Sequence, residues 1–489
     1  MLQSIKQLSP AIKSSVVYTI SNVVSKGLVF LTIPIFTRLM KTEQIGVVNL
    51  YASWYSMICV VASLSLTAGG FQVAMKDYPN RRDQYQSSVL TLTSLFSVFF
   101  IMVFCISPSF WSNILKLPVS LIHLMLFGFL VYPARDIWLA RQRYEYKYKL
   151  PGVVIIGSSL LASIFSVLAV YIAKDRGYQE TAIVRLLANY LIMYGVAGIL
   201  ATSIFIKGKT FYNKEFWLFS LALSIPLIGN SLATQVLNLS DRVMIRHFVG
   251  EREVGIYGTI FIVSSISQLV WSSINASFVP YLFENLDNPQ KRTSIKVIAK
   301  GFMFAYAGIA FAITLLAPEI IRIMATPEYL EAVCIMPPIA AGIFMISLSN
   351  LYTNVLIYHK KTQYVMIATV IAAITNVLLN YICIPCFGYM VAAYTTLVAH
   401  IVLAFFQYIV SNRVHSKMCP DDHDNVYDNK VMLMITGLAL LVCLVCVFLY
   451  FNTILRYIVI ASIAGCFLIL KNRIIAVVRD YAHLLQRRA

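Results

Sequence analysis

The sequence predicts an all-α polytopic membrane protein with about 14 transmembrane helices, arranged as two parallel six-helix lobes around a central cleft plus two extra C-terminal helices. Of its 489 residues, 59% are hydrophobic and only 12% are charged, whereas soluble domains carry about 25% charged residues. Many hydrophobic runs reach the roughly 20 residues that a membrane span requires. An internal repeat then divides these spans into two halves.

The spans follow one another with short polar loops between them. The first begins after a polar, basic segment, contains Lys26 and lacks a small-residue cleavage site, so it is interpreted as a membrane helix and not as a removed signal peptide. The fourteen candidate spans lie near residues 14–36, 43–70, 86–108, 120–141, 151–173, 182–206, 215–239, 254–280, 296–317, 333–357, 363–386, 388–411, 430–451 and 455–471.

The basic residues are distributed unevenly between the two sides of the predicted membrane. An even number of spans places both termini on one side, and this side holds 26 of the 39 Lys and Arg residues. The opposite loops hold 11, and Lys26 and Arg135 lie within spans. Because cytoplasmic loops are enriched in basic residues, both termini are predicted to be cytoplasmic. The same pattern explains the net charge of +18 without nucleic acid as a partner.

Short matches between the two halves indicate the internal repeat. Six spans separate the copies, so the halves are predicted to lie parallel and to be related by an axis along the membrane normal. We expect an N-terminal lobe at 1–210, a C-terminal lobe at 211–415, and an acidic loop, two helices and a basic tail at 416–489. The matched residues are Gly46 with Gly255, Pro79 with Pro289, Pro108 with Pro318 and Gly177 with Gly388, at offsets of 209, 210, 210 and 211.

Polar residues are stacked along single faces of several predicted helices. In the first span, Ser15, Thr19, Asn22 and Lys26 follow at spacings of 4, 3 and 4. Polar groups are costly in lipid, so such stripes must face another helix or a wet cavity. Hydrogen bonding between helices explains any one stripe, but five stripes in both halves favour a shared hydrophilic cavity. The other stripes include Ser231, Thr234, Asn238, Asp241, Gln268, Asn275, Asn350, Asn354, Asn376 and Asn380.

Lys26 lies about twelve residues into its span, roughly 18 Å along a helix and so near the middle of a ~30 Å hydrocarbon core. It is interpreted as facing the cavity and meeting an anionic group, although a pair with a neighbouring carboxylate or carbonyl is the alternative. For Arg135 and Asp136, a local ion pair and a ligand contact are equally good interpretations. Arg38, Asp241, Arg242 and Arg246 are expected at the outer rim of the first and seventh spans, with a solvated loop as the alternative.

Carboxylates are scarce within the spans, and Asp136 is the one that lies clearly inside. A cavity for organic cations would be expected to contain acids, whereas a phosphate-bearing substrate favours Lys and Arg. The residues therefore favour an anionic substrate. The tract at 141–149, RQRYEYKYK, is typical of anchoring at a membrane interface and of contact with lipid phosphates.

No motif for an enzyme or a metal site is present. The sequence lacks GxxxxGK[ST], HExxH and GxSxG. The pairs Cys383/Cys386 and Cys443/Cys446 have no second pair, and His123 and His400 have no ligand partner at metal spacing. We therefore expect no catalysis, no cofactor and no metal.

At TRLMKTEQIG (37–46) and SDRVMIRHFVGEREVGIYG (240–258), the chain resembles the bacterial flippases of polysaccharide repeat units, the O-antigen and capsule translocases. These belong to a superfamily with the multidrug extruders and the lipid II flippases, and the two extra C-terminal spans resemble the latter. The resemblance implies alternating access, which carries undecaprenyl-diphosphate-linked oligosaccharide across the bacterial inner membrane, with membrane lipids and a polysaccharide polymerase as partners. It also implies a cationic cavity.

The predicted pyrophosphate and sugar cavity draws on residues from six spans. Two other functions compete with the flippase. A cation-coupled multidrug antiporter of the same architecture would require an acidic site in the first or seventh span, and a membrane glycosyltransferase would require a sizeable loop with catalytic acids. The predicted cavity residues are Asn22, Lys26, Arg38, Arg135, Asn238, Asp241, Arg242, Arg246, Gln268, Asn275, Asn350, Asn354 and Asn376.

Overall fold

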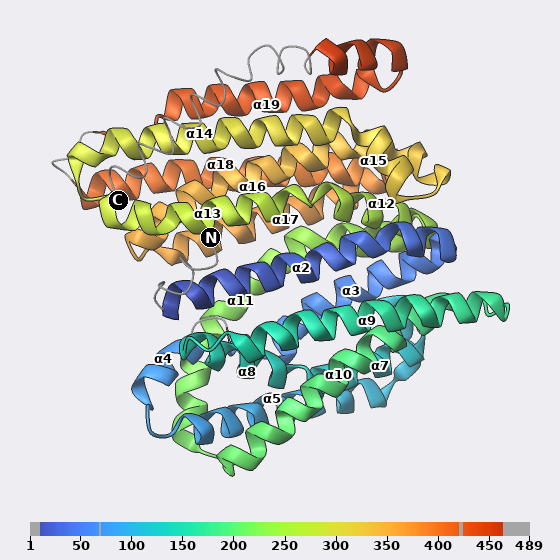
Figure 1. The fold of residues 1–489 in the computed structure, drawn as a ribbon, viewed down its shortest axis with the longest axis vertical. Helices are drawn as coiled ribbons and strands as arrows, with labels where there is room; N and C mark the ends of the chain where they lie inside the picture. Colours follow the sequence, from blue (N-terminus) through green and yellow to red (C-terminus); the bar gives the residue numbers. More distant parts are fainter. Residues whose placement is uncertain (1–9, 68–69, 420–423, 463–489) are drawn as a thin grey trace.

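The computed structural model describes residues 10–67, 70–419 and 424–462, and every regular element in this part of the chain is a helix. In Figure 1 the helices form two groups, with α11 crossing between them. We call the end of the bundle where α2 begins the proximal end, and the end where α2 finishes the distal end. Successive long helices then run alternately between these two ends.

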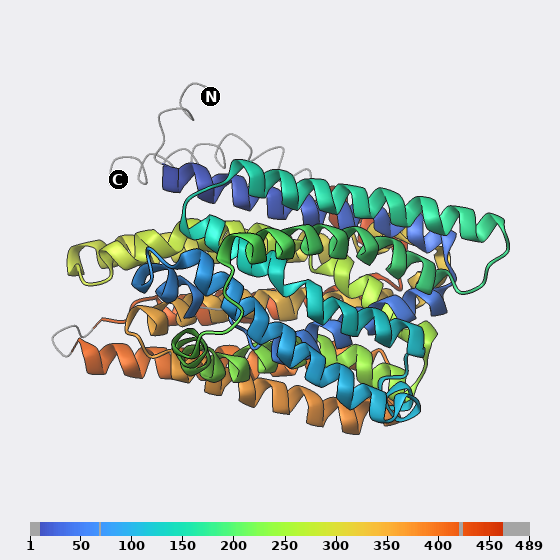
Figure 2. The same cartoon turned by 90° about the horizontal axis from the view of Figure 1, so that it is seen from below.

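The first group contains the helices that precede residue 210. Figure 2 shows α2 running alongside α9, and the two helices are in contact along their length. The helices are α2 (Pro10–Leu39), α3 (Thr42–Ala62), α4 (Gly70–Asp77), α5 (Arg82–Ile106), α6 (Pro108–Leu115), α7 (Val119–Val131), α8 (Pro133–Tyr144), α9 (Lys149–Asp175) and α10 (Thr181–Gly208).

The second group follows α11, which packs against both α3 and α17. Its last labelled helix, α19, lies against α14 and α16 at the outside of the group. The connecting helix α11 spans Lys214–Phe248, and the elements of the second group are α12 (Glu251–Ser264), α13 (Ser267–Asn285), α14 (Pro289–Leu315), α15 (Ala317–Met324), the 3-10 helix η1 (Pro327–Ile335), α16 (Met336–Tyr358), α17 (Thr362–Phe387), α18 (Val391–Met418) and α19 (Asn429–Leu449).

These helices confirm the predicted fold class. In the described residues, 12 helices are long and apolar enough to cross a membrane, and the bent helix α11 makes 13. The fourteenth predicted span, 455–471, begins in the short apolar helix Thr453–Ser462, and the rest of it lies outside the described residues. The lobe boundaries at 210 and 415 remain a prediction.

Three of the predicted single spans are interrupted. The fourth is divided into α7 and α8 before Pro133, which has no backbone N–H for a helical hydrogen bond. The eighth is divided into α12 and α13, where the hydroxyls of Ser264 and Ser265 donate to the backbone oxygens of Ile260 and Ile262, both at 2.8 Å. Such bonds compete with the regular helix. The seventh, α11, bends by 45° at Pro226.

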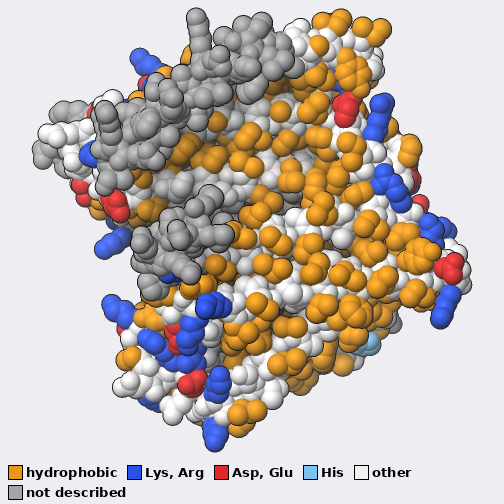
Figure 3. Space-filling view, viewed as in Figure 1, with side chains coloured by type: hydrophobic (Ala, Val, Ile, Leu, Met, Phe, Trp, Pro, Cys, Tyr) orange, Lys and Arg blue, Asp and Glu red, His pale blue; other side chains and the backbone are white. Residues whose placement is uncertain are grey.

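The charged side chains gather at the two ends of the bundle. Figure 3 shows Lys, Arg, Asp and Glu at both ends of this face and a broad hydrophobic zone between them. Long apolar side chains well inside the spanning helices, such as Leu191 and Ile199 of α10 and Phe405 of α18, are exposed. Exposed apolar surface between two charged ends is the arrangement that a bilayer requires of the helices it surrounds.

The two groups are joined at the distal end by a close crossing of α3 and α12. A Cβ atom on Gly46 would overlap the backbone oxygen of Glu251, and one on Gly255 would overlap the backbone oxygen of Thr42. Thr42 and Glu251 are separated by the same 209 residues as the two glycines. The crossing is therefore symmetric with respect to the internal repeat, and glycine at its centre lets the two backbones approach closely.

The hydrophobic cores show how far this junction extends. One core combines residues of both groups near the distal end, including Ile45, Leu50, Val254 and Tyr257. At the proximal end, a separate core contains residues of the first group together with Phe216 from the start of α11. The two groups thus share an apolar core distally, whereas their proximal parts pack separately.

We expect Gly46→Ala to destabilise the distal junction, because the added methyl group meets a backbone oxygen that cannot rotate away. Overpacking of this kind typically costs about 1–3 kcal/mol. The apparent melting temperature of the purified protein in detergent should therefore fall. The matched control is Gly157→Ala in α9, where no atom lies within 4 Å of the added Cβ. Equal melting of the two variants would contradict a close-packed junction.

Candidate substrate pathway

The polar residues of helix α2 lie on two neighbouring faces of the helix. One face packs on α9: the hydroxyl of Ser159 donates to Oγ of Ser25 at 3.0 Å, and Tyr18 donates to the backbone oxygen of Lys147 at 3.0 Å. Gly152 of α9 keeps this contact close, since a Cβ there would lie 3.4 Å from Oγ of Ser21. This face is the one that anchors α2.

The other polar face of α2 is the predicted stripe, and it is exposed. Ser15, Thr19, Asn22 and Lys26 are all exposed to the surroundings of the packed helices. Lys26 has no hydrogen bond or ion pair with any described residue. The alternative of a carboxylate partner on a neighbouring helix is therefore wrong for the described residues. An uncompensated ammonium at this depth is tolerated only where water or an anion reaches it.

Exposed polar residues also occur on α11 and α13. Gln268 on α13 is exposed, as is Thr234 on α11, and Asn238 is half-buried with its amide donating to the backbone oxygen of Thr234 at 2.9 Å. Asn275 is instead used between helices, because its side-chain oxygen accepts from the amide of Asn354 of α16 at 2.8 Å. The hydrogen bond between Asn275 and Asn354 agrees with the alternative interpretation, in which the polar stripes bond helices to one another.

Asp241 belongs to a buried polar network. Its carboxylate accepts hydrogen bonds from the hydroxyl of Tyr257 at 2.6 Å, the amide of Asn380 at 2.6 Å and the hydroxyl of Thr396 at 2.7 Å. The amide of Asn376 extends the network by donating to Oγ1 of Thr396 at 2.9 Å. Four helices, α11, α12, α17 and α18, are thereby joined around one carboxylate that is only 1% exposed.

The placement of Asp241 and Arg242 corrects the prediction from sequence. The seventh span was expected to end near residue 239, with these residues at the rim or in a solvated loop. Helix α11 instead continues to Phe248, and Arg242 is 5% exposed with its guanidinium 4.7 Å from the ring centre of Phe261. Asp241 and Arg242 are therefore buried, because residues far away in the sequence, such as Thr396 and Phe261, pack against them.

The remaining distal arginines are engaged in structural contacts. Arg38 is exposed and donates to the backbone oxygens of Pro34 at 2.7 Å and of Ile323 at 3.2 Å. Arg246 forms an ion pair with Glu251. These contacts place Arg38 and Arg246 at the distal end, as expected, and tie α2 and α11 to neighbouring elements.

Of the two interpretations of Arg135 and Asp136, the local ion pair is absent, because no ion pair between them is present in the described part of the chain. The guanidinium of Arg135 instead donates to the hydroxyl of Tyr132 at 2.7 Å and lies 5.5 Å from its ring centre. Asn350 is half-buried on α16, one turn before Asn354. The structure therefore does not bring the thirteen predicted residues together in one closed pocket.

A group of metal-ligand type, which the sequence did not reveal, lies at the proximal end of the second group of helices. Ligand atoms of His359, His415 and Cys419 lie within 4.8 Å of one another. Arg292, which can only donate, lies 2.9 Å from Nε2 of His415, so Nδ1 of His415 carries the proton and donates to His359 at 3.1 Å. Both ring nitrogens of His415 are thus in use, and we assign no metal here.

Several solved structures have a similar arrangement of helices. The lipid II flippase MurJ in an inward closed conformation has a TM-score of 0.60 and 15% identity, covering 91% of this chain and 100% of its own. An inward-facing multidrug resistance MATE transporter of the MOP superfamily has a TM-score of 0.58 and 13% identity, with 81% and 95% covered. At these identities the likeness shows the fold alone, which this chain shares with both structures.

A MOP-superfamily transporter from Pyrococcus furiosus, described as having a binding pocket of reverse polarity, gives a TM-score of 0.54 at 14% identity and covers 84% of this chain and 97% of its own. No curated protein matches the sequence. The sequence model of the family described as "Polysaccharide biosynthesis protein" matches residues 11–286, more than half of the chain. The chain belongs to this family. The MatE family model also matches residues 226–382.

We expect Asp241→Ala to destabilise the protein strongly, because three buried donors lose their acceptor. Each buried donor left unsatisfied costs roughly 1–3 kcal/mol. Thermal unfolding in detergent should show a clear loss for Asp241→Ala and a smaller one for Asp241→Asn, which keeps one acceptor. The control is Asn238→Ala, whose side chain bonds only to its own helix. If Asp241→Ala melts like the control, the network does not hold the four helices together.

Proposed function

We propose that this protein flips undecaprenyl-diphosphate-linked oligosaccharide repeat units from the cytoplasmic to the periplasmic leaflet for the synthesis of a surface polysaccharide, either O-antigen or capsule. The observation that carries the proposal is the exposed polar face of α2, which ends in the uncompensated ammonium of Lys26. Membership of the polysaccharide biosynthesis family and the likeness to a lipid II flippase support a lipid-linked glycan as the substrate.

The chemistry of the α2 stripe suits both parts of such a substrate. Lys26 provides a cation for the diphosphate, and charge-assisted hydrogen bonds to phosphate are stronger than those between neutral groups. The hydroxyl and amide groups of Ser15, Thr19 and Asn22 provide donors and acceptors for sugar hydroxyls. No carboxylate lies on this stripe to compete for the ammonium.

The geometry of the bundle suits alternating access. The two groups of helices share a core at the distal end and pack separately at the proximal end. We propose that the proximal end is cytoplasmic, with both termini there and the chain in the bacterial inner membrane. Under this orientation the structure is closed towards the periplasm, and transport requires the α3–α12 crossing to open.

A cation-coupled multidrug antiporter is the competing function, and Asp241 with the MatE match at 226–382 favours it. The Asp241 carboxylate, however, is already occupied by three hydrogen-bond donors from three other helices. A drug cation would have to displace these donors from within the packed helices. We therefore favour the flippase, with a polysaccharide polymerase as the expected partner.

Lys26→Ala should abolish or strongly reduce surface glycan in a strain that lacks the chromosomal gene, because the diphosphate loses its cation. Lys26→Arg should retain more export than Lys26→Gln. Surface glycan and undecaprenyl-linked intermediates are measured together with the amount of inserted protein. Lys76→Ala, an exposed lysine outside α2, is the control. Normal glycan in Lys26→Ala would remove this residue from the site, and altered drug sensitivity with normal glycan in the deletion strain would favour the antiporter.

Orientation is tested separately with single cysteines in a cysteine-free background. Asn113→Cys lies at the distal end and Gln290→Cys at the proximal end, and both positions are exposed. A membrane-impermeant maleimide should label the cysteine at 113 in intact spheroplasts and the cysteine at 290 only after lysis. The reverse pattern would place the proximal end outside the cytoplasm.

A further inference from the structure

A cavity of about 650 Å³ lies at the proximal end of the first group of helices. The start of α5, the end of α8, the turn at 145–148, the start of α9 and the end of α10 line it, and it is open on one side. Its volume is in the range of about 300–1,000 Å³ that small-molecule sites occupy. Some of the lining residues belong to the tract RQRYEYKYK (141–149), to which the proposed transport function assigns no role.

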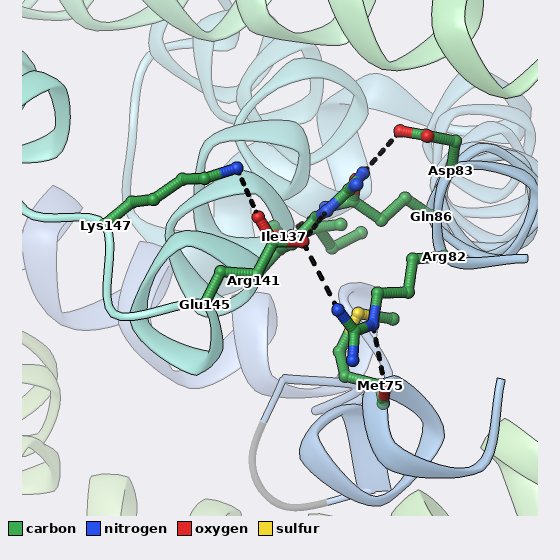
Figure 4. A network of polar contacts seen from close by, with 8 residues as sticks. All are labelled: Met75, Arg82, Asp83, Gln86, Ile137, Arg141, Glu145 and Lys147. Atoms are coloured by element: carbon green, nitrogen blue, oxygen red, sulfur yellow. Dashed lines mark hydrogen bonds and ion pairs between the residues drawn. The ribbon is translucent and has the colours of Figure 1, made fainter. Parts of the chain in front are cut away.

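An ion-pair network forms one wall of this cavity, and Figure 4 shows it. Arg141 lies at its centre and donates to Asp83 at 2.5 Å, to Gln86 at 2.7 Å and to Glu145 at 2.8 Å. Glu145 also accepts from Lys147 at 2.6 Å. The guanidinium of Arg141 is therefore used to fix the wall.

The two acidic groups of the cavity are both neutralised by this network. Burial alone would raise the pKa of Glu145, but the hydrogen bonds from Lys147 and Arg141, and their charges, hold this pKa below its ordinary value. Glu145 therefore stays ionised and paired at neutral pH. The carboxylate of Asp83 is paired with Arg141.

Two other cations that line the cavity take no part in this network. Lys149 at the start of α9 and Lys207 at the end of α10 line the cavity and have no hydrogen-bond or ion-pair partner among the described residues. The cavity-lining charges are Arg141, Lys147, Lys149 and Lys207 against Asp83 and Glu145, which leaves a net positive charge of two. A net positive cavity with two free ammonium groups is suited to a phosphate.

The surroundings of the cavity are those of a membrane interface. Trp138, Ile204 and Pro151 give it apolar walls, and Leu150, Val153 and Ile206 beside it are exposed apolar side chains that begin the hydrophobic zone. Lysine and tyrosine side chains with an apolar stem and a polar tip are typical of this depth. A ligand with a phosphate and an acyl chain would satisfy both parts of the site.

We propose that this cavity binds the phosphate headgroup of an anionic membrane phospholipid, with Lys149 and Lys207 as the phosphate ligands and the Arg141 network as the fixed wall. The lipid comes from the leaflet at the proximal end, and its acyl chains leave past Leu150 and Ile206. This site is separate from the α2 stripe, so it provides lipid-dependent stabilisation of the first group of helices and not transport itself.

The test is native mass spectrometry of the full-length protein in detergent, titrated with phosphatidylglycerol or with phosphatidylcholine. The wild type should bind phosphatidylglycerol more tightly than phosphatidylcholine. Because each basic residue near an anionic lipid contributes roughly 1 kcal/mol, Lys149→Gln with Lys207→Gln should weaken phosphatidylglycerol binding about thirtyfold if the two effects add. Lys76→Gln with Lys214→Gln, the same charge change at exposed proximal positions outside the cavity, should leave it unchanged.

An arginine variant and an inorganic phosphate control complete the test. Lys149→Arg with Lys207→Arg keeps both charges and should retain selective binding, even if the glutamine variant folds poorly. Inorganic phosphate alone should not reproduce the thermal stabilisation that phosphatidylglycerol gives. Equal binding of the two lipids, equal loss in the control variant, or full stabilisation by inorganic phosphate would overturn the proposal. Since none of these assays measures glycan export, their failure leaves the proposed transport function untouched.

Discussion

The close approach of α3 and α12 at Gly46 and Gly255 is the constraint on which the rest of the structure depends. It brings two backbones together where no side chain fits between them, and it lets the two groups of helices share one apolar core at the distal end. Hydrophobic burial does not drive helices together in lipid, so small residues that allow close packing have to supply the contact. Because this contact is confined to the distal end, the proximal part of the first group has a hydrophobic core of its own.

The polar stripes show how one sequence pattern is used in two ways. Asp241 of α11 and Asn376 of α17 are buried and satisfied by partners on α11, α12, α17 and α18, so these two members of the polar stripes hold helices together. Lys26 and Asn22 have the same helical spacing but remain exposed. A membrane penalises both arrangements unless a partner is present. The partner is protein in the first case, and in the second we propose that it is the substrate.

The cations of the chain also differ in their availability. Arg141, Arg246 and Arg242 are held by carboxylates or by an aromatic ring, and they act as fixed structural elements. Lys26, Lys149 and Lys207 have no such partners among the described residues. Arginine presents a planar group with several donors that suits fixed networks, whereas lysine is a flexible point charge. This division explains why we assign the anion-binding roles to lysines.

The sequence by itself determined the fold class, the run of membrane helices and the match of Gly46 with Gly255 in the internal repeat, because hydrophobic length and repeated motifs can be read along the chain; that the two glycines lie at a close crossing of α3 and α12 came from the structure. The sequence also identified Lys26, since depth within a span can be counted. Only the tertiary structure decided that Asp241 is buried beside Tyr257 and Thr396, that Arg135 contacts Tyr132, and that Lys149 and Lys207 share a cavity. Each of these depends on which faces of separate helices meet, and no periodicity within a single helix records that pairing.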